Sequence, residues 1–130
     1  MRNLFAQAAD GTGRAERLTT SPDKQFATGA TPDRLLFTQR SPQTGEDVLQ
    51  VEMAGTHMVT PLVQTPGQER NGVVSHDGRW LAYEANDSGA FEIFVRPYPD
   101  LASGASRRDA RPFTGRSPRG KLRLACAPFS

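Results

Sequence analysis

The sequence predicts an all-β protein built from small antiparallel sheets that repeat along the chain. One observation is a tight turn, Ser75-His76-Asp77-Gly78, followed by two segments rich in aromatic and aliphatic residues. Another is a repeat of about 44 residues that recurs through most of the chain. The 130 residues also include 12 glycines and 10 prolines, which indicate many turns and therefore short strands.

The turn is predicted from the chemistry of its side chains. Ser75 and Asp77 can accept hydrogen bonds from nearby backbone N–H groups, and Gly78 can adopt the positive φ that such turns need. Asp33 occupies the same place in an earlier copy of the turn. We therefore assign Ser75, Asp77, Gly78 and Asp33 a structural role in turns rather than a chemical one.

Two strands are expected to leave this turn as a hairpin. Residues 79–85 place Trp80, Ala82 and Glu84 on one side and Leu81, Tyr83 and Ala85 on the other. The polar residues 86–89 then form a second turn that leads into a strand at 91–98.

Internal repeats organise the rest of the chain. Segments 3–6, 47–50 and 92–95 align as strand starts at spacings of 44 and 45 residues, and segment 31–36 aligns with 75–81 at 44. The first turn copy lacks the glycine, so this alignment contains a one-residue deletion and pairs Leu36 with Leu81. A weaker copy starts at 117, where Arg119 replaces the aspartate.

A period of this length with four strand-sized segments is typical of a β-propeller blade, whose repeat is about 40–45 residues long. We predict a partial β-propeller of about three four-stranded antiparallel blades, two of them well marked and the C-terminal one degenerate. The expected strands are 3–9 and 14–19; then 25–30, 34–39, 47–53 and 59–64; then 70–74, 79–85, 91–98 and a poorly marked strand near 107–113.

The segment Ser75-His76-Asp77-Gly78-Arg79-Trp80-Leu81-Ala82-Tyr83 resembles the Ser-Pro-Asp-Gly-Arg-x-(Leu/Ile)-Ala-(Tyr/Phe) signature of TolB-like, WD-like β-propeller repeats. Residues 92–99 are similar to the form these repeats take in C-terminal propellers of bacterial serine/threonine kinases and related regulators. His76 replaces the usual proline. The resemblance covers residues 3 to about 100, so we divide the chain into blades at 1–100 and a basic, degenerate blade or disordered tail at 101–130.

The sequence contains none of the common catalytic motifs considered next. There is no Gly-x-Ser-x-Gly elbow and no phosphate-binding loop, His57 and His76 lack zinc-like spacing, and Cys126 is the single cysteine. We therefore predict a non-catalytic module without a cofactor or metal that binds a protein or peptide. Trp80 and Phe94 are assigned to the core, and Arg79, Arg96 and Tyr98 are the exposed candidates for partner binding.

Two other functions stay open. The resemblance also extends to propellers that accompany hydrolase domains in prolyl-oligopeptidase-like peptidases, which makes an accessory part of such an enzyme possible. The C-terminal tail allows weak, non-specific nucleic-acid binding, because its basic residues outnumber its one acid. These basic residues are Arg107, Arg108, Arg111, Arg116, Arg119, Lys121 and Arg123.

An arc of about three blades would leave the apolar faces of its end blades uncovered. Because propellers of this kind resemble closed rings of six or more blades, we expect two copies to pair as a homodimer that completes a ring. The sequence contains neither 18 consecutive apolar residues nor an N-terminal secretory segment, so the expected location is the cytoplasm, away from membranes.

Overall fold

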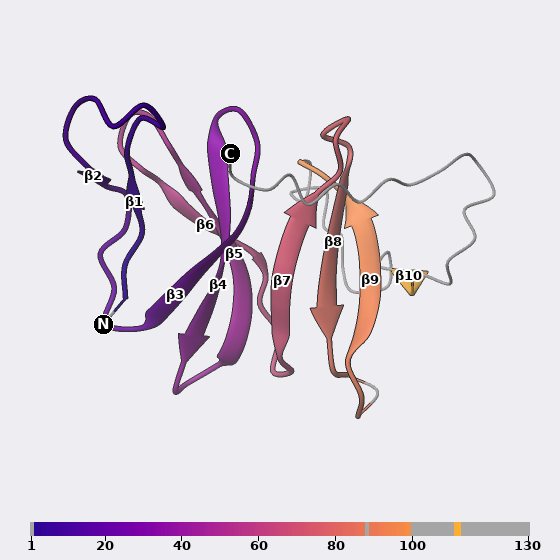
Figure 1. Cartoon of the computed structure of the whole chain (residues 1–130). Coiled ribbons are helices and arrows are strands. Elements are labelled where there is room, and N and C mark those ends of the chain that lie inside the picture. The colour runs from indigo at the N-terminus through magenta and orange to yellow at the C-terminus, as the bar shows by residue number, and fades with distance from the viewer. Residues whose placement is uncertain (1, 88, 100–110, 113–130) are drawn as a thin grey trace.

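The computed structural model describes residues 2–87, 89–99 and 111–112, and these residues form β-strands and turns without any helix (Figure 1). The strands are β1 (Phe5–Ala6), β2 (Glu16–Arg17), β3 (Lys24–Ala30), β4 (Arg34–Ser41), β5 (Gly45–Glu52), β6 (Val59–Val63), β7 (Glu69–Val74), β8 (Trp80–Ala85), β9 (Glu92–Pro97) and β10 (Arg111–Pro112). The all-β prediction is therefore confirmed for this part of the chain.

These strands form three antiparallel sheets. The two-stranded sheet is β1-β2, and the two four-stranded sheets have the orders β3-β4-β5-β6 and β10-β9-β8-β7. Each strand of the larger sheets therefore pairs with the next strand in the sequence, as a chain of hairpins does. Figure 1 shows the three sheets arranged in sequence order from one side of the molecule to the other.

The sheet pairing corrects the predicted alignment of the two turns. Ala30 pairs with Leu35 in the first hairpin, and Val74 pairs with Leu81 in the second. Leu81 therefore corresponds to Leu35 and not to Leu36, and the second turn is longer by two residues. The predicted one-residue deletion is wrong. It matches identical residues of the two turns, whereas the hydrogen-bonded pairing of the strands decides which residues correspond. A shift of one residue in this pairing turns every side chain of a strand to the opposite face of the sheet.

The apolar core consists of two layers, one between each pair of neighbouring sheets. The first layer, between β1-β2 and β3–β6, contains Leu4, Leu18, Leu35, Phe37, Leu49 and Val51. The second layer, between β3–β6 and β7–β10, contains Leu36, Val48, Leu62, Val63, Leu81, Tyr83, Ala85 and Tyr98. Because the middle sheet contributes to both layers, its alternate residues are buried on both faces.

The edge strands β3 and β7 of the two larger sheets approach closely at two glycines. The Thr28 hydroxyl donates a hydrogen bond to the Gly72 carbonyl at 2.6 Å. A Cβ atom at Gly72 would lie 2.5 Å from Cγ1 of Val48, and one at Gly29 would lie 3.4 Å from the Gly72 carbonyl oxygen. The absence of side chains here lets the two larger sheets come together.

Polar contacts also cross the second layer. The buried Tyr98 hydroxyl donates to Oε1 of Gln50 at 2.7 Å, and Arg96 donates from Nη1 to the Leu62 carbonyl at 3.3 Å. A hydrogen bond between Tyr98 and Arg34 is also the main reason that the pKa of Arg34 lies above its ordinary value.

Replacing Tyr98 with phenylalanine is expected to lower the free energy of unfolding by ~1–3 kcal/mol, because it leaves the buried Gln50 oxygen without its donor. Urea denaturation of both proteins measures this difference. The double variant Tyr98→Phe/Gln50→Leu is the matched control, since removal of both polar partners should recover part of the loss. Equal stability of Tyr98→Phe and the unchanged protein would contradict the role of this bond.

Within the described residues, no helix is long and apolar enough to cross a membrane.

Candidate functional site

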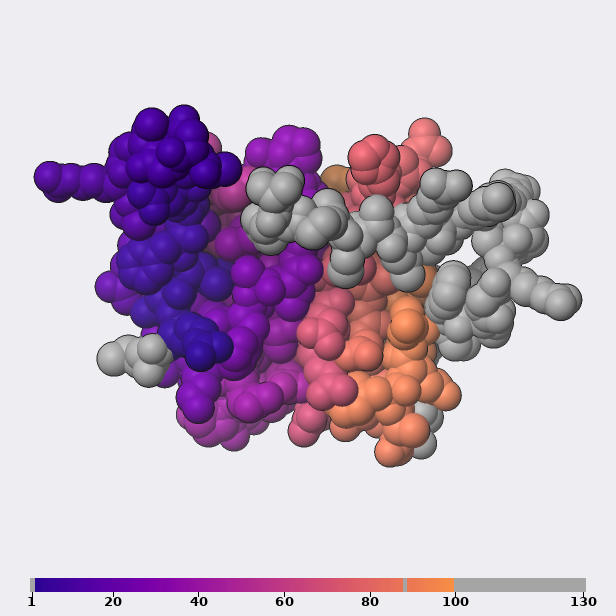
Figure 2. All heavy atoms as spheres, in the orientation of Figure 1, coloured from indigo at the N-terminus to yellow at the C-terminus, as the bar shows by residue number. Residues whose placement is uncertain are grey.

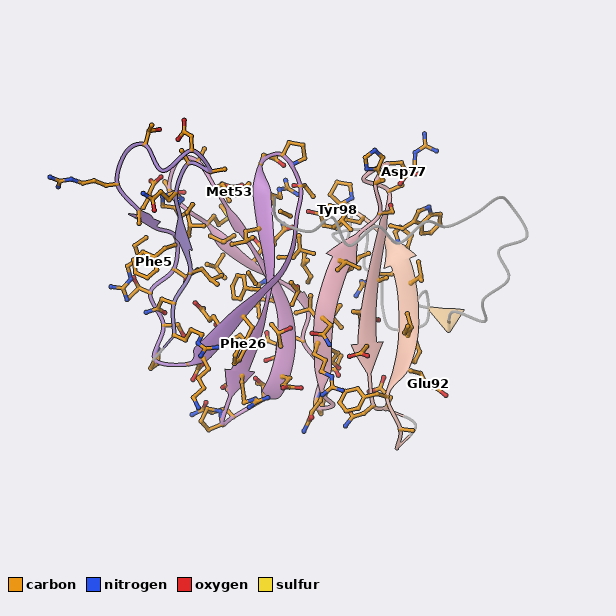
Figure 3. The ribbon with its side chains drawn as sticks, viewed as in Figure 1. Phe5, Phe26, Met53, Asp77, Glu92 and Tyr98 are labelled. Atoms are coloured by element: carbon orange, nitrogen blue, oxygen red, sulfur yellow. The ribbon has the colours of Figure 1, made fainter. Side chains whose placement is uncertain are left out.

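The turn at residues 75–79 is held by its own polar groups. Ser75 donates from Oγ to Oδ1 of Asp77 at 2.5 Å, and the same carboxylate accepts from the Arg79 N–H at 3.1 Å. The Trp80 N–H donates to Oγ of Ser75 at 3.1 Å, and Gly78 has φ +74°. The Ser75 hydroxyl is therefore engaged in shaping the turn, which lies at one end of β8 (Figure 3).

These hydrogen bonds predict a pH response. The bond from Ser75, followed by that from the Arg79 N–H, lowers the pKa of Asp77 below its ordinary value of 3.8. A lowered pKa means that the carboxylate stabilises the folded state above the unfolded-state pKa, and that this contribution is lost as the pH falls through the folded-state pKa. We expect NMR titration of the Asp77 carboxyl carbon to give a midpoint below 3.8.

The matched control for this titration is Ser75→Ala. It removes the largest cause of the shift and should move the Asp77 midpoint upward. An unchanged midpoint in Ser75→Ala would show that the hydroxyl does not stabilise the carboxylate.

The earlier copy of the turn is shorter but uses the same chemistry. Thr31 donates from Oγ1 to Oδ1 of Asp33 at 2.9 Å, and the Arg34 N–H donates to Oγ1 of Thr31 at 3.1 Å. The Asp33 carbonyl also accepts from the Met53 N–H at 3.0 Å. This aspartate therefore joins the β3–β4 turn to the end of β5.

The three residues predicted to be exposed for partner binding do not form one surface. Arg79 is exposed at the turn, whereas Arg96 and Tyr98 are buried. The expectation of exposure is wrong for these two residues because Arg96 pairs with Leu81, and directly paired residues of an antiparallel sheet lie on the same face. That face is covered by the sheet β3–β6.

Trp80 also differs from its predicted place in the core. It lies on the face opposite Leu81, and its exposed fraction is 38%. Phe94, on the buried face, packs against the second layer with its ring centroid 5.9 Å from that of Tyr83. The alternation along β8 and β9 therefore places the two aromatic residues on opposite faces.

The face that carries Trp80 is an apolar surface without a neighbouring sheet among the described residues. We call it the terminal face and define it by Val73, Trp80, Ala82, Ile93 and Val95. Ala82 pairs with both Val73 and Val95, which places these three side chains together. Ile93, whose exposed fraction is 40%, lies beside them on the same face.

A hollow of about 390 Å³ opens beside the terminal face, where β3 and β7 approach each other. Its apolar lining includes Val73, Ala82 and Ile93, and its polar lining includes Thr28, Asn71 and Glu84. Glu84 accepts from Asn71 Nδ2 at 2.7 Å and from Arg70 Nε at 2.9 Å through Oε2. The lining of the hollow thus combines apolar side chains with a carboxylate.

Comparison of repeat positions explains why this face is apolar. Ile93 occupies the same place in its repeat as Leu4 and Val48, and each of these is buried in a layer between sheets. Val48 has no exposed surface, whereas 40% of Ile93 is exposed. The terminal face therefore has the composition of a sheet-packing surface but no sheet covering it within the described residues.

The opposite end of the molecule shows the complementary pattern. Phe5 corresponds to Leu49 and Phe94, which lie on the face of their sheet that is turned toward the preceding sheet, and its exposed fraction is 59%. Phe5 pairs with Arg17, whose guanidinium carbon lies 6.0 Å from the ring centroid. We call the surface formed by Phe5 and Arg17 the leading face. Figures 2 and 3 show that β1 and β9, which carry the two faces, lie at opposite ends of the described structure.

The described residues contain no group of three or more His, Cys, Asp or Glu side chains that could hold a metal ion. His57 contacts the Glu52 carbonyl at 3.0 Å and the Glu16 carboxylate at 2.8 Å, and these contacts raise its pKa. His76 is exposed in the turn. Arg111 contributes its backbone to β10, and the other basic tail residues and Cys126 lie outside the described residues.

Comparisons with known proteins give a structural likeness only. No protein-family model matches the chain, and no curated protein matches it by sequence. A solved structure described as "putative TolB from Agrobacterium tumefaciens" is similar with a TM-score of 0.63 and 19% sequence identity. The similarity covers 80% of this chain but 35% of that protein, so the chain spans about a third of its length.

Proposed function

We propose that the chain is a non-catalytic segment of a β-propeller and that it binds protein through the terminal face. The successive order of strands in the two larger sheets, their face-to-face layers and the TolB-like structural neighbour support the propeller assignment. In this proposal each four-stranded sheet is one blade, β1-β2 is the outer half of a preceding blade, and the whole chain amounts to about three blades.

The exposure of Ile93 is the observation on which the binding proposal rests. Its counterparts Leu4 and Val48 are both covered by a neighbouring sheet, and Trp80 and Val95 extend the same apolar surface. Contiguous apolar patches on a protein surface mark interaction sites, because the exposure of apolar side chains to water is unfavourable. Arg79, which is exposed next to Trp80, is the candidate for a polar contact at the edge of the face.

Site-specific photocrosslinking tests this function. A photoreactive amino acid replaces Ile93 in one variant and Met58 in a control, because Met58 is an exposed apolar residue outside the terminal face. We expect discrete protein adducts from position 93 in cells that express the full chain, and few from position 58. Equal or absent adducts at both positions would contradict a binding role for the face.

The function as an accessory part of a hydrolase-like enzyme has less support. In the turn, Ser75 is hydrogen-bonded to Asp77 and to the Trp80 N–H, an arrangement that caps a turn. We expect the isolated chain not to hydrolyse ester or peptide substrates, and turnover that disappears in Ser75→Ala would contradict this. Nucleic-acid binding through 101–130 would instead be sensitive to salt and lost on deletion of that segment.

A further inference from the structure

The structure points to a second copy of this chain as the occupant of the terminal face, an inference that rests on the proposed function. We propose that the leading face of one copy docks on the terminal face of another, head to tail. Within the described residues, β1 and β9, which carry the two faces, lie at opposite ends of the structure (Figure 1).

The two layers within the chain provide a template for this contact. In the first layer Leu4 belongs to the same cluster as Leu49, and in the second layer Phe94 packs against the cluster that contains Val48. Leu4, Val48 and Ile93 are equivalent repeat positions, and so are Phe5, Leu49 and Phe94. A contact between Ile93 and Phe5 of a second copy would therefore be the next member of the same series.

The shapes of the faces also match. The leading face presents one large exposed ring, Phe5, and the hollow of about 390 Å³ beside the terminal face is lined in part by Val73, Ala82 and Ile93. Arg17 accompanies the ring, and Glu84, which is already paired with Arg70, also lines the hollow, so that polar groups would border the apolar contact. An aromatic side chain in an apolar pocket is typical of the energetic centre of a protein interface.

Head-to-tail contact has a consequence for assembly. Unlike faces generate a closed ring if the rotation between copies closes and an open filament if it does not. We expect the rotation to close after two copies, so that each leading face meets a terminal face in a closed dimer.

Sedimentation velocity of the full chain over a range of concentrations tests the proposal. We expect a dimer for the unchanged protein and at least ~10-fold weaker self-association for Phe5→Glu and for Ile93→Glu, because each places a charge in an apolar contact. Met58→Glu is the matched control, since Met58 is 57% exposed and lies outside both faces. It should remain dimeric. All the altered side chains are exposed, and far-UV circular dichroism checks that the variants fold.

Mixing the two variants distinguishes unlike from like faces. Phe5→Glu retains its terminal face and Ile93→Glu its leading face, so an equal mixture should form a heterodimer through one intact contact. A monomeric mixture, with a dimeric unchanged protein, would overturn the head-to-tail arrangement. A monomer at every concentration would overturn the second copy as occupant.

The crosslinking experiment separates this inference from the proposed function. Adducts from position 93 with twice the mass of the chain support the second copy. Adducts only with other proteins, together with a monomeric chain, would leave protein binding in place and overturn the dimer. No adduct at position 93 and no dimer would overturn both.

Discussion

Replacing Phe37 with alanine is expected to lower the free energy of unfolding by ~3–5 kcal/mol, the largest effect that the fold predicts for a single substitution. Phe37 has no exposed surface and lies in the first layer with Leu4 and Leu49. Truncation of its ring leaves a cavity between β1-β2 and the sheet β3–β6, and close-packed sheets fill such a cavity only in part. Urea denaturation followed by far-UV circular dichroism measures the loss.

The control for this experiment is Met58→Ala. Met58 is exposed, and its substitution should change the free energy of unfolding by less than ~0.5 kcal/mol. If Phe37→Ala lowered the free energy of unfolding by no more than Met58→Ala does, the first layer would not be a packed core.

The second large effect is expected at the contact between the two four-stranded sheets. Gly72→Ala should lower the free energy of unfolding by ~1–3 kcal/mol, because overpacking forces neighbouring groups apart. The added Cβ would lie 2.5 Å from Cγ1 of Val48, a β-branched side chain with no exposed surface. Either Val48 or the whole of β7 must move to relieve this contact.

A double-mutant cycle with Val48→Ala identifies the cause. Val48→Ala removes the methyl group that the new Cβ would meet, so the double variant should be less destabilised than the sum of the two single variants. The free energies of unfolding of all four proteins give the coupling. Strict additivity would mean that Gly72 and Val48 do not contact each other and that β7 does not pack against the middle sheet at this point.

The sequence predicted the strands well because their ends depend on local chemistry. The turn at 75–79 needs hydrogen-bonding side chains and a glycine at positive φ. The sequence shows both features, in Ser75 and Asp77 and in Gly78. The strands predicted at 34–39 and 47–53 are found as β4 and β5 with small changes at their ends. The strands predicted at 3–9 and 14–19 form only the short ladder of β1 and β2, since each pairs over two residues.

Burial was harder to predict because it depends on which sheet covers which face. Tyr98 and Arg96 look like surface residues by type, yet the sheet β3–β6 covers them and Gln50 and Leu62 accept their hydrogen bonds. Trp80 looks like a core residue by type, yet its face carries no further sheet within the described residues.

The signal for the candidate site was present in the repeat. The alignment of 3–6, 47–50 and 92–95 already made Leu4, Val48 and Ile93 equivalent. This alignment could not show to which face of its sheet each side chain points. The predicted alignment of the two turns differs by one residue from the hydrogen-bonded pairing of β7 with β8. A shift of one residue exchanges the two faces of a strand.

The face-to-face packing of successive sheets is the claim from which the terminal face, the leading face and the proposed partner all follow. Nuclear Overhauser contacts in the isotope-labelled chain test it most directly. The structure predicts contacts between the Val48 methyl groups and the Gly72 α-protons, and between the Tyr98 ring and the Gln50 side chain. A well-folded protein that lacks both sets of contacts would contradict the stacking of β7–β10 on β3–β6.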